Sequence, residues 1–150
     1  MKNRTLWTVL LFSFLGYIII LFWIWINPIE KNNYMFEGKG TRNFPYKINS
    51  VEDLEQFRDL VNNGEGFSHI YFEQTTDLDL SNVENWVSIG VYGGNKYFHG
   101  IYNGAGHTIS NLISINEGNT GLFGILCGEV WNLGIESGYS NGLHVGSISS

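Results

Sequence analysis

The sequence predicts a β-solenoid of parallel strands, preceded by a short capping helix and an N-terminal transmembrane helix. Three observations carry this prediction: an uncharged run near the N-terminus, a change of hydrophobic period near residue 66, and a repeated strand-and-turn unit rich in glycine. The predicted organisation is a cytoplasmic tail over 1–5, a membrane helix over 6–26, a linker over 27–47, a capping-helix region over 48–66 and repeats over 67–150. We expect the last repeat to be truncated at the C-terminus.

Composition favours a folded domain and argues against a nucleic-acid partner. Aromatic residues and charged residues each make up 15% of the chain, unlike a disordered composition. Lys2 and Arg4 precede the uncharged run, and all fourteen acids follow it together with six basic residues, a balance of -8. Phosphates require clustered Lys and Arg, so this excess of acids disfavours nucleic acid. Cys127 is the single cysteine, which excludes an intrachain disulfide.

The uncharged run from Leu6 to Ile26 predicts a membrane-spanning helix. A helix of this length extends about 32 Å, which matches a hydrocarbon core of about 30 Å. Trp7 stands at one end and Trp23 and Trp25 at the other, where interfacial aromatics belong. A cleaved signal peptide is the alternative, but its shorter apolar core would be followed by small residues at the cut.

Topology follows from the charges beside this run. Lys2 and Arg4 favour a cytoplasmic N-terminus, so we expect a single-pass protein in the cell membrane with an extracytoplasmic C-terminal domain. The lipid bilayer is then one expected partner.

A short amphipathic helix is expected after the linker. Ser50 is a candidate N-cap, with Asp53 three residues later as the capping-box acid. Apolar residues follow at helical spacing, and Asn62-Asn63-Gly64 supplies a stop. We expect this helix to cover the end of the repeats.

Strands are expected after residue 66, where the period becomes two. Fourteen of the nineteen glycines lie from Gly90 onward, between short apolar runs. Ile109-Ser-Asn-Leu112 recurs as Val130-Trp-Asn-Leu133, so the offset of the repeat is the step from Ile109 to Val130. A repeat this short suits one coil of a solenoid, and it predicts that Asn111 and Asn132 lie on neighbouring coils and form an amide ladder.

Two segments resemble bacterial surface proteins that carry the GLUG motif. Phe98-His-Gly-Ile-Tyr-Asn-Gly-Ala-Gly-His-Thr-Ile-Ser-Asn-Leu112 is similar to their F-x-G-x-x-[DN]-G-x-G-H-x-I-x-x-L segment, and Gly121-Leu-Phe-Gly124 is similar to the GLUG motif itself. The motif residues, all expected to be structural, are Phe98, Gly100, Asn103, Gly104, Gly106, His107, Ile109, Asn111, Leu112, Gly121, Leu122, Phe123, Gly124, Val130, Asn132 and Leu133.

The resemblance implies a right-handed parallel β-helix in large exported proteins, including adhesins and some immunoglobulin A peptidases. We therefore expect a non-catalytic module for adhesion or ligand binding, with a glycan or a surface protein as the ligand and no cofactor. The alternative is the N-terminal part of a polysaccharide lyase or hydrolase, or of a surface peptidase, with catalytic residues beyond residue 150.

Few residues point to catalysis or metal binding. Asp77 and Asp79 would share one face of a strand about 6.6–6.8 Å apart, near the range of inverting glycosidases, although turn structure or a calcium contact explains them as well. His99 and His107 flank a turn, but no acid stands at a recognisable ligand spacing, so no metal site is predicted.

The remaining candidates have structural interpretations. Cys127 is expected to be a small buried residue rather than a nucleophile. Asn103-Gly-Ala-Gly106 lacks the context of a dinucleotide-binding loop. Four tyrosines could either stack on sugars from an exposed position or fill the core, namely Tyr92, Tyr97, Tyr102 and Tyr139.

Overall fold

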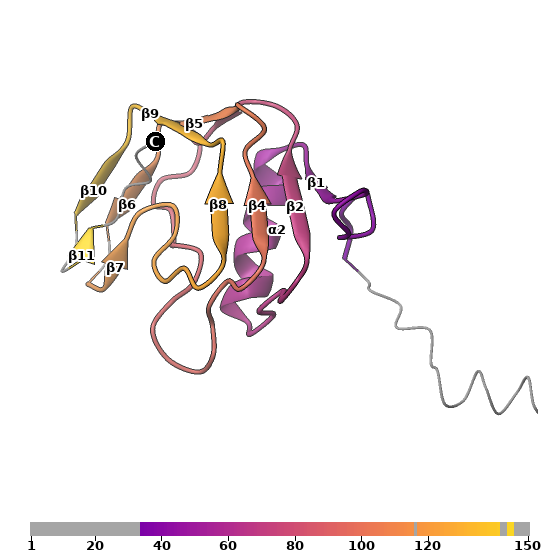
Figure 1. Ribbon diagram of the computed structural model, residues 1–150. Coiled ribbons are helices and arrows are strands. Elements are labelled where there is room, and N and C mark those ends of the chain that lie inside the picture. The colour runs from indigo at the N-terminus through magenta and orange to yellow at the C-terminus, as the bar shows by residue number, and fades with distance from the viewer. Residues whose placement is uncertain (1–33, 116, 142–143, 146–150) are drawn as a thin grey trace, which may run out of the picture. The chain divides into compact units, whose positions relative to one another are not determined.

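The computed structural model describes residues 34–115, 117–141 and 144–145. The chain divides into two compact units, Met1–Met35 and Phe36–Ser150, and every element described below belongs to the second unit. This unit contains one described helix, α2 (Val51–Asn62), and short β-strands (Figure 1).

The helix begins and ends where the sequence predicts. Ser50 is the N-cap, with extended backbone, and its side chain accepts a hydrogen bond from the backbone N–H of Asp53 at 3.2 Å. The Asp53 carboxylate in turn accepts from the backbone N–H of Asn49 at 2.8 Å. Glu52 and Asp53 place acids in the first turn, where the helix dipole favours them. The chain leaves the helix at Asn63 and Gly64, and Gly64 has a φ of 104°.

The strands form four small sheets, and every pairing between them is parallel. The largest has the order β1-β2-β4-β8, built from Tyr46–Ile48, Tyr71–Gln74, Ile101–Asn103 and Glu129–Trp131. The second has the order β3-β5-β9, built from Leu78–Asp79, Thr108–Ser110 and Gly134–Glu136. Two-stranded sheets pair β6 (Ile113–Ile115) with β10 (Tyr139–Asn141), and β7 (Asn119–Thr120) with β11 (His144–Val145).

The strand register overturns the coil of constant length that the repeat predicts. Among the paired strands, the interval between paired positions is shortest where Asn119 pairs with His144 and longest where Leu78 pairs with Ile109. Every interval between the paired strands is longer than the predicted step. Val130, for example, pairs with Tyr102 and not with Ile109. Asn111 and Asn132 therefore do not occupy equivalent positions, and the predicted ladder between them is wrong.

The turns between strands differ in length, so the sequence repeat does not show which strands pair. Between β4 and β5 the chain uses four residues, Gly104–His107, whereas two residues, Asn132 and Leu133, join β8 to β9. The longer turn lies so close to the next pass of the chain that a Cβ on Gly104 would stand 2.4 Å from the carbonyl oxygen of Asn132. Only glycine permits that approach.

The hydrophobic core lies between α2 and the inner side of the four-stranded sheet. Figure 1 shows α2 running beside β1, β2 and β4. Phe57 on the helix is fully buried, and its ring centroid lies 4.5 Å from that of Phe72 and 5.0 Å from that of Phe98. Such ring pairs contribute about 0.5–1.5 kcal/mol each beyond the area that they bury. The helix is thus part of the core, and more than the end cap that the sequence predicts.

These observations correct the expected fold class. The described chain has one helix, which packs against the β1-β2-β4-β8 sheet, and four small parallel sheets; the all-β right-handed parallel β-helix with a transmembrane helix in front of it is not observed. Two physical reasons account for the difference. The pairing intervals vary instead of following one period, and α2 packs inside the structure through Leu54, Phe57 and Val61.

The expected membrane anchor is corrected as well. Among the residues described, no helix has both the length and the apolar character needed to cross a bilayer. The run of residues 6–26, with Leu6, Trp7, Trp23, Trp25 and Ile26, lies outside the described residues. The structure therefore gives no support to a single-pass membrane location, and we do not retain it.

Candidate functional site

The outer side of the four-stranded sheet carries one continuous row of polar and aromatic side chains. Strict alternation places every second residue of each strand on this side, while the residues between them enter the core. The strand register aligns Lys47 with Glu73, Glu73 with Asn103, and Asn103 with Trp131. A row that crosses four parallel strands is held at fixed spacing by the backbone hydrogen bonds.

Hydrogen bonds between neighbouring side chains link most of this row. Lys47 forms an ion pair with the Glu73 carboxylate, which also accepts from the Asn103 amide at 3.4 Å. The Asn103 carbonyl oxygen accepts from the backbone N–H of Ala105 at 3.0 Å and from the Asn132 amide at 3.4 Å. Amide ladders therefore exist in this fold, but Asn132 is hydrogen-bonded to Asn103 and not to Asn111.

Trp131 ends the row as an exposed aromatic side chain. The Trp131 side chain lies on the outer side of the sheet, and the residue is 51% exposed. Glu129, also exposed, is two residues earlier on the same strand and therefore on the same side, about 6.6–6.8 Å away along the strand. The neighbouring positions in register with Glu129 are Ile101 and Tyr71, both half-buried. Trp131 and Glu129 form the aromatic and acidic end of this outer face.

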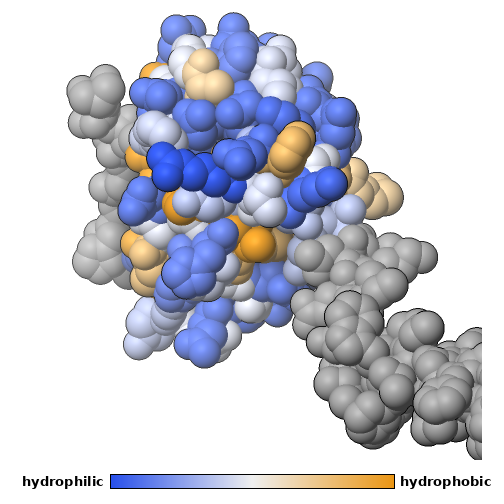
Figure 2. All heavy atoms as spheres, turned by 45° about the vertical axis from the view of Figure 1, so that its right-hand side comes forward, coloured by the Kyte–Doolittle hydropathy of each residue, from blue (hydrophilic) through white to orange (hydrophobic). Residues whose placement is uncertain are grey.

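Figure 2 shows one side of the molecule, on which hydrophilic residues predominate and hydrophobic residues stand in small separate groups. That side carries no broad apolar area of the kind that marks obligate protein interfaces. Recognition on such a surface depends on particular side chains.

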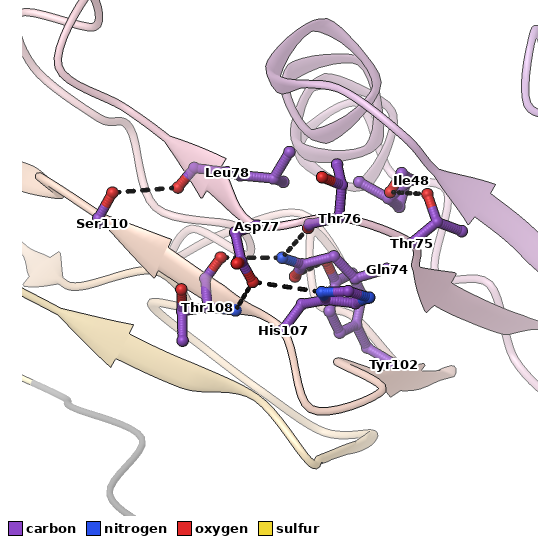
Figure 3. A network of polar contacts seen from close by, with 10 residues as sticks. All are labelled: Ile48, Gln74, Thr75, Thr76, Asp77, Leu78, Tyr102, His107, Thr108 and Ser110. Carbon is purple, nitrogen blue, oxygen red and sulfur yellow. Dashed lines mark hydrogen bonds and ion pairs between the residues drawn. The ribbon is translucent and has the colours of Figure 1, made fainter.

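A second polar cluster lies where β3 and β5 pair, and it brings together two residues that the sequence singles out separately (Figure 3). One carboxylate oxygen of Asp77 accepts from the backbone N–H of Thr108 at 2.9 Å and lies 3.2 Å from Nδ1 of His107. The hydrogen bond from Thr108, aided by His107, lowers the pKa of the Asp77 carboxyl below its ordinary value.

Asp79, two residues later, is held in the same manner. Its carboxylate accepts from the Asn111 amide at 2.8 Å and from the backbone N–H of Ser81 at 2.9 Å, and these bonds lower its pKa. Asn111 continues the ladder, because its amide oxygen accepts from the Ser137 hydroxyl at 3.4 Å. Asn111 and Ser137 both have left-handed backbone, with φ of 56° and 48°.

These bonds describe turn structure better than acid catalysis. A general acid needs a raised pKa, whereas both carboxyl groups have lowered pKa values and accept hydrogen bonds from neighbouring turns. Within the described ranges, no three His, Cys, Asp or Glu side chains gather where they could hold a metal ion. The predicted alternation itself is confirmed, since Leu78 and Leu80 are buried while Asp77 and Asp79 are exposed.

A buried polar network beneath this cluster is one that the sequence reasoning missed. Gln74 is fully buried, and its amide donates to the carbonyls of Thr76 at 2.8 Å and Thr108 at 3.0 Å (Figure 3). Its amide oxygen accepts from the Tyr102 hydroxyl at 3.0 Å. Burial raises the pKa of Tyr102 far above its ordinary value. Gln74 stands at an inward position of the alternating run 71–74, and this alternation is the sequence signal from which its burial could have been predicted.

The motif residues divide by position in the fold. Nine of them are buried: Phe98, Gly100, Gly104, Ile109, Leu112, Gly121, Leu122, Phe123 and Leu133. Four are half-buried, Asn103, His107, Gly124 and Val130, and three are exposed, Gly106, Asn111 and Asn132. Most of the motif thus lies in the core or in tight contacts between passes.

Other candidates differ from expectation. Cys127 is exposed, so its prediction as a buried residue is wrong. Tyr102 is fully buried, whereas Tyr92 and Tyr139 are exposed. In the sequence, Trp131 stands out only as a member of the repeated segment Val130-Trp-Asn-Leu133. The alternation of Glu129-Val130-Trp131 could also have predicted that its first and third side chains are exposed.

Comparison with known proteins gives one structural relative to report. No family model matches the chain, and no curated protein matches it either. A crystal structure of a putative immunoglobulin A1 protease from Bacteroides ovatus is similar, with a TM-score of 0.55 and 27% sequence identity. The match covers 69% of this chain, and the chain spans 30% of the length of that protein. None of these comparisons provides evidence for a GLUG motif or an adhesin, and neither description is retained for this protein.

Proposed function

We propose that this chain is a non-catalytic module that binds a protein ligand for a larger peptidase-like protein. The observation that carries the proposal is the outer face of the β1-β2-β4-β8 sheet, where a polar row ends at Trp131, with Glu129 two residues earlier on the same side of β8. A rigid surface with an exposed aromatic anchor suits binding, because little side-chain freedom is lost when the partner docks.

The structural relative favours a protein as the ligand. Its description names a protein substrate, immunoglobulin A1, and this chain is similar to less than one third of its length. A module of that size can assist a peptidase by holding the substrate while the chemistry takes place elsewhere. The glycan ligand expected as the other possibility has less support, because the Asn103 amide already donates to Glu73 and accepts from Ala105 and Asn132.

The non-catalytic part of the proposal rests on the state of Asp77 and Asp79. Both carboxylates accept hydrogen bonds that stabilise their charged form, so neither is suited to donate a proton. Their geometry serves the contact between β3 and β5.

Binding of the full chain to immobilised immunoglobulin A1 tests the proposal, with immunoglobulin G as the control ligand. The full chain is kept in a nonionic detergent, because residues 6–26 carry no charge. We expect saturable binding to immunoglobulin A1 that Trp131→Ala weakens. Tyr92→Ala is the matched control, since Tyr92 is 90% exposed and lies in the loop before Phe98.

Absence of saturable binding to immunoglobulin A1 would contradict the proposed ligand. Binding that is equally strong for Trp131→Ala would contradict the assignment of the face. Cleavage of immunoglobulin A1 by the purified chain, lost in Asp77→Asn, would contradict the non-catalytic interpretation.

A further inference from the structure

The molecule already contains one place where a tryptophan ring and carboxylates hold a cation. The Arg58 guanidinium lies 4.8 Å from the centroid of the Trp86 ring. It also pairs with Glu55 at 3.3 Å and with Asp59 at 2.8 Å. A guanidinium is attracted by the negative face of the ring and by the carboxylates at the same time. Trp86 is fully buried, so this arrangement serves the docking of α2.

The outer face repeats this combination at Trp131 and Glu129 without a cation of its own. Both residues are exposed and point to the same side of β8. In the described ranges, ring–cation contacts are found at Phe44 and at Trp86 and none at Trp131. The ring and the carboxylate are therefore available to a cation from another molecule.

The charge of the surrounding chain supports the same ligand. After Lys96 the sequence contains no Lys or Arg, whereas it contains Glu117, Glu129 and Glu136. The whole chain has a net charge of -6. A cationic group thus meets an attractive field on approach, and an acidic one is repelled.

We propose that Trp131 and Glu129 form a recognition site for an arginine or lysine side chain of the protein ligand. This inference rests on the proposed function and names the chemistry that its face selects. Arginine suits the site better than lysine, because its planar guanidinium stacks on an indole and bonds a carboxylate through two N–H groups.

The row beside Trp131 favours a cation over a neutral sugar. Lys47 neutralises Glu73, and the Asn103 amide donates to Glu73 and accepts from the backbone N–H of Ala105. A polyhydroxyl ligand would find few free amide partners there. A cation needs only the ring face and the carboxylate, which are both exposed.

The test uses two blocked peptides and one sugar as probes of the full chain in nonionic detergent. The first peptide is acetyl-Ser-Arg-Ser-Arg-Ser-amide, and the second replaces each arginine by citrulline, which keeps the planar shape without the charge. A neutral cello-oligosaccharide is the third probe. Titration calorimetry at low salt measures each affinity for the wild type and for Trp131→Ala, Glu129→Gln and Tyr92→Ala.

We expect the arginine peptide to bind more tightly than the citrulline peptide. Trp131→Ala should weaken that binding about 2- to 5-fold, the range for an exposed cation–π contact. Glu129→Gln should weaken it by a similar factor of about 1.5 to 5, and added salt should reduce the affinity. Tyr92→Ala should leave it unchanged, and far-UV circular dichroism of each variant checks that the fold is retained.

Equal affinity for the two peptides, or an arginine affinity unchanged in Trp131→Ala, would overturn the inference. Binding of the cello-oligosaccharide that Trp131→Ala abolishes would also overturn it, in favour of a sugar site. The outcome is separable from that of the proposed function. A chain that binds the arginine peptide through Trp131 but ignores immunoglobulin A1 keeps the site and loses the proposed ligand, and the reverse result loses the site alone.

Discussion

The two sides of the four-stranded sheet use the same strands for opposite purposes. Positions in register across the sheet form an inner row of Tyr46, Phe72, Tyr102 and Val130, and an outer row of Lys47, Glu73, Asn103 and Trp131. The inner row is buried over its first three members, and the outer row is half-buried or exposed. One residue of shift along the chain separates a core position from a surface position.

The comparison teaches where each kind of substitution should be felt. Inner side chains pack against rings from α2 and from neighbouring passes, so their loss leaves a cavity. Outer side chains hold one another through part-buried or exposed hydrogen bonds, which contribute little to stability because water competes for them. Stability should therefore depend on the inner side and binding on the outer side.

The largest expected effect is that of Phe72→Ala. Phe72 is 1% exposed and its ring lies against Phe57, Phe67 and Phe98. We expect the free energy of unfolding to fall by about 3–5 kcal/mol, from lost burial and the cavity left behind. Trp131→Ala on the outer side should cost less than about 1 kcal/mol. Urea unfolding of both variants, followed by circular dichroism, measures the difference, and equal losses would break the division between the two sides.

A smaller effect is expected from Tyr102→Phe, which removes one hydroxyl from the inner row. The amide oxygen of buried Gln74 then loses its donor, at a cost of about 1–3 kcal/mol.

Because burial raises the pKa of Tyr102, the folded state binds this proton more tightly than the unfolded state. Its contribution to stability is therefore complete below about pH 10 and declines as the pH rises further.

Unfolding measured between about pH 8 and pH 11, on either side of the ordinary tyrosine pKa, checks this sign. The wild type should lose stability along the alkaline limb faster than Tyr102→Phe does. Tyr92→Phe is the matched control, because Tyr92 is exposed. An alkaline limb of the same slope in the wild type and in Tyr102→Phe would show that burial of Tyr102 is not coupled to folding.

The smallest effect should appear in acid, at the exposed turn contact of Asp77. Its pKa is lowered in the folded protein by Thr108 and His107, so its contribution is present above about pH 3.9 and is lost as the pH falls below that value. Asp77→Asn should therefore flatten the acid limb of the stability profile. Glu84→Gln, a substitution of an exposed acid elsewhere, is the control and should leave the limb unchanged. A limb as steep in Asp77→Asn as in the wild type would remove the carboxylate from this account.

Parts of the candidate site were predictable and others were not. The exposed positions of Asp77 and Asp79 follow from alternation with Leu78 and Leu80, and Ser50 indicated the start of the helix. The contact between Asp77 and His107 could not be derived, because it joins distant parts of the chain through a register that no local pattern specifies. Trp131 and Glu129 were visible as an alternating pair, but their significance depends on the row with which they align.

The local elements of this protein can be predicted from its sequence, since caps, alternation and glycine turns act over a few residues. The sequence indicated α2, several strands and the acidic balance that a cationic ligand would meet. Strand pairing became visible only in the fold, because turns of four residues and of two residues shift the intervals between equivalent positions. The fold likewise shows that Asn132 bonds with Asn103 and that α2 enters the core. Pairing and packing depend on contacts between distant segments, and a repeat read at constant period misplaces them.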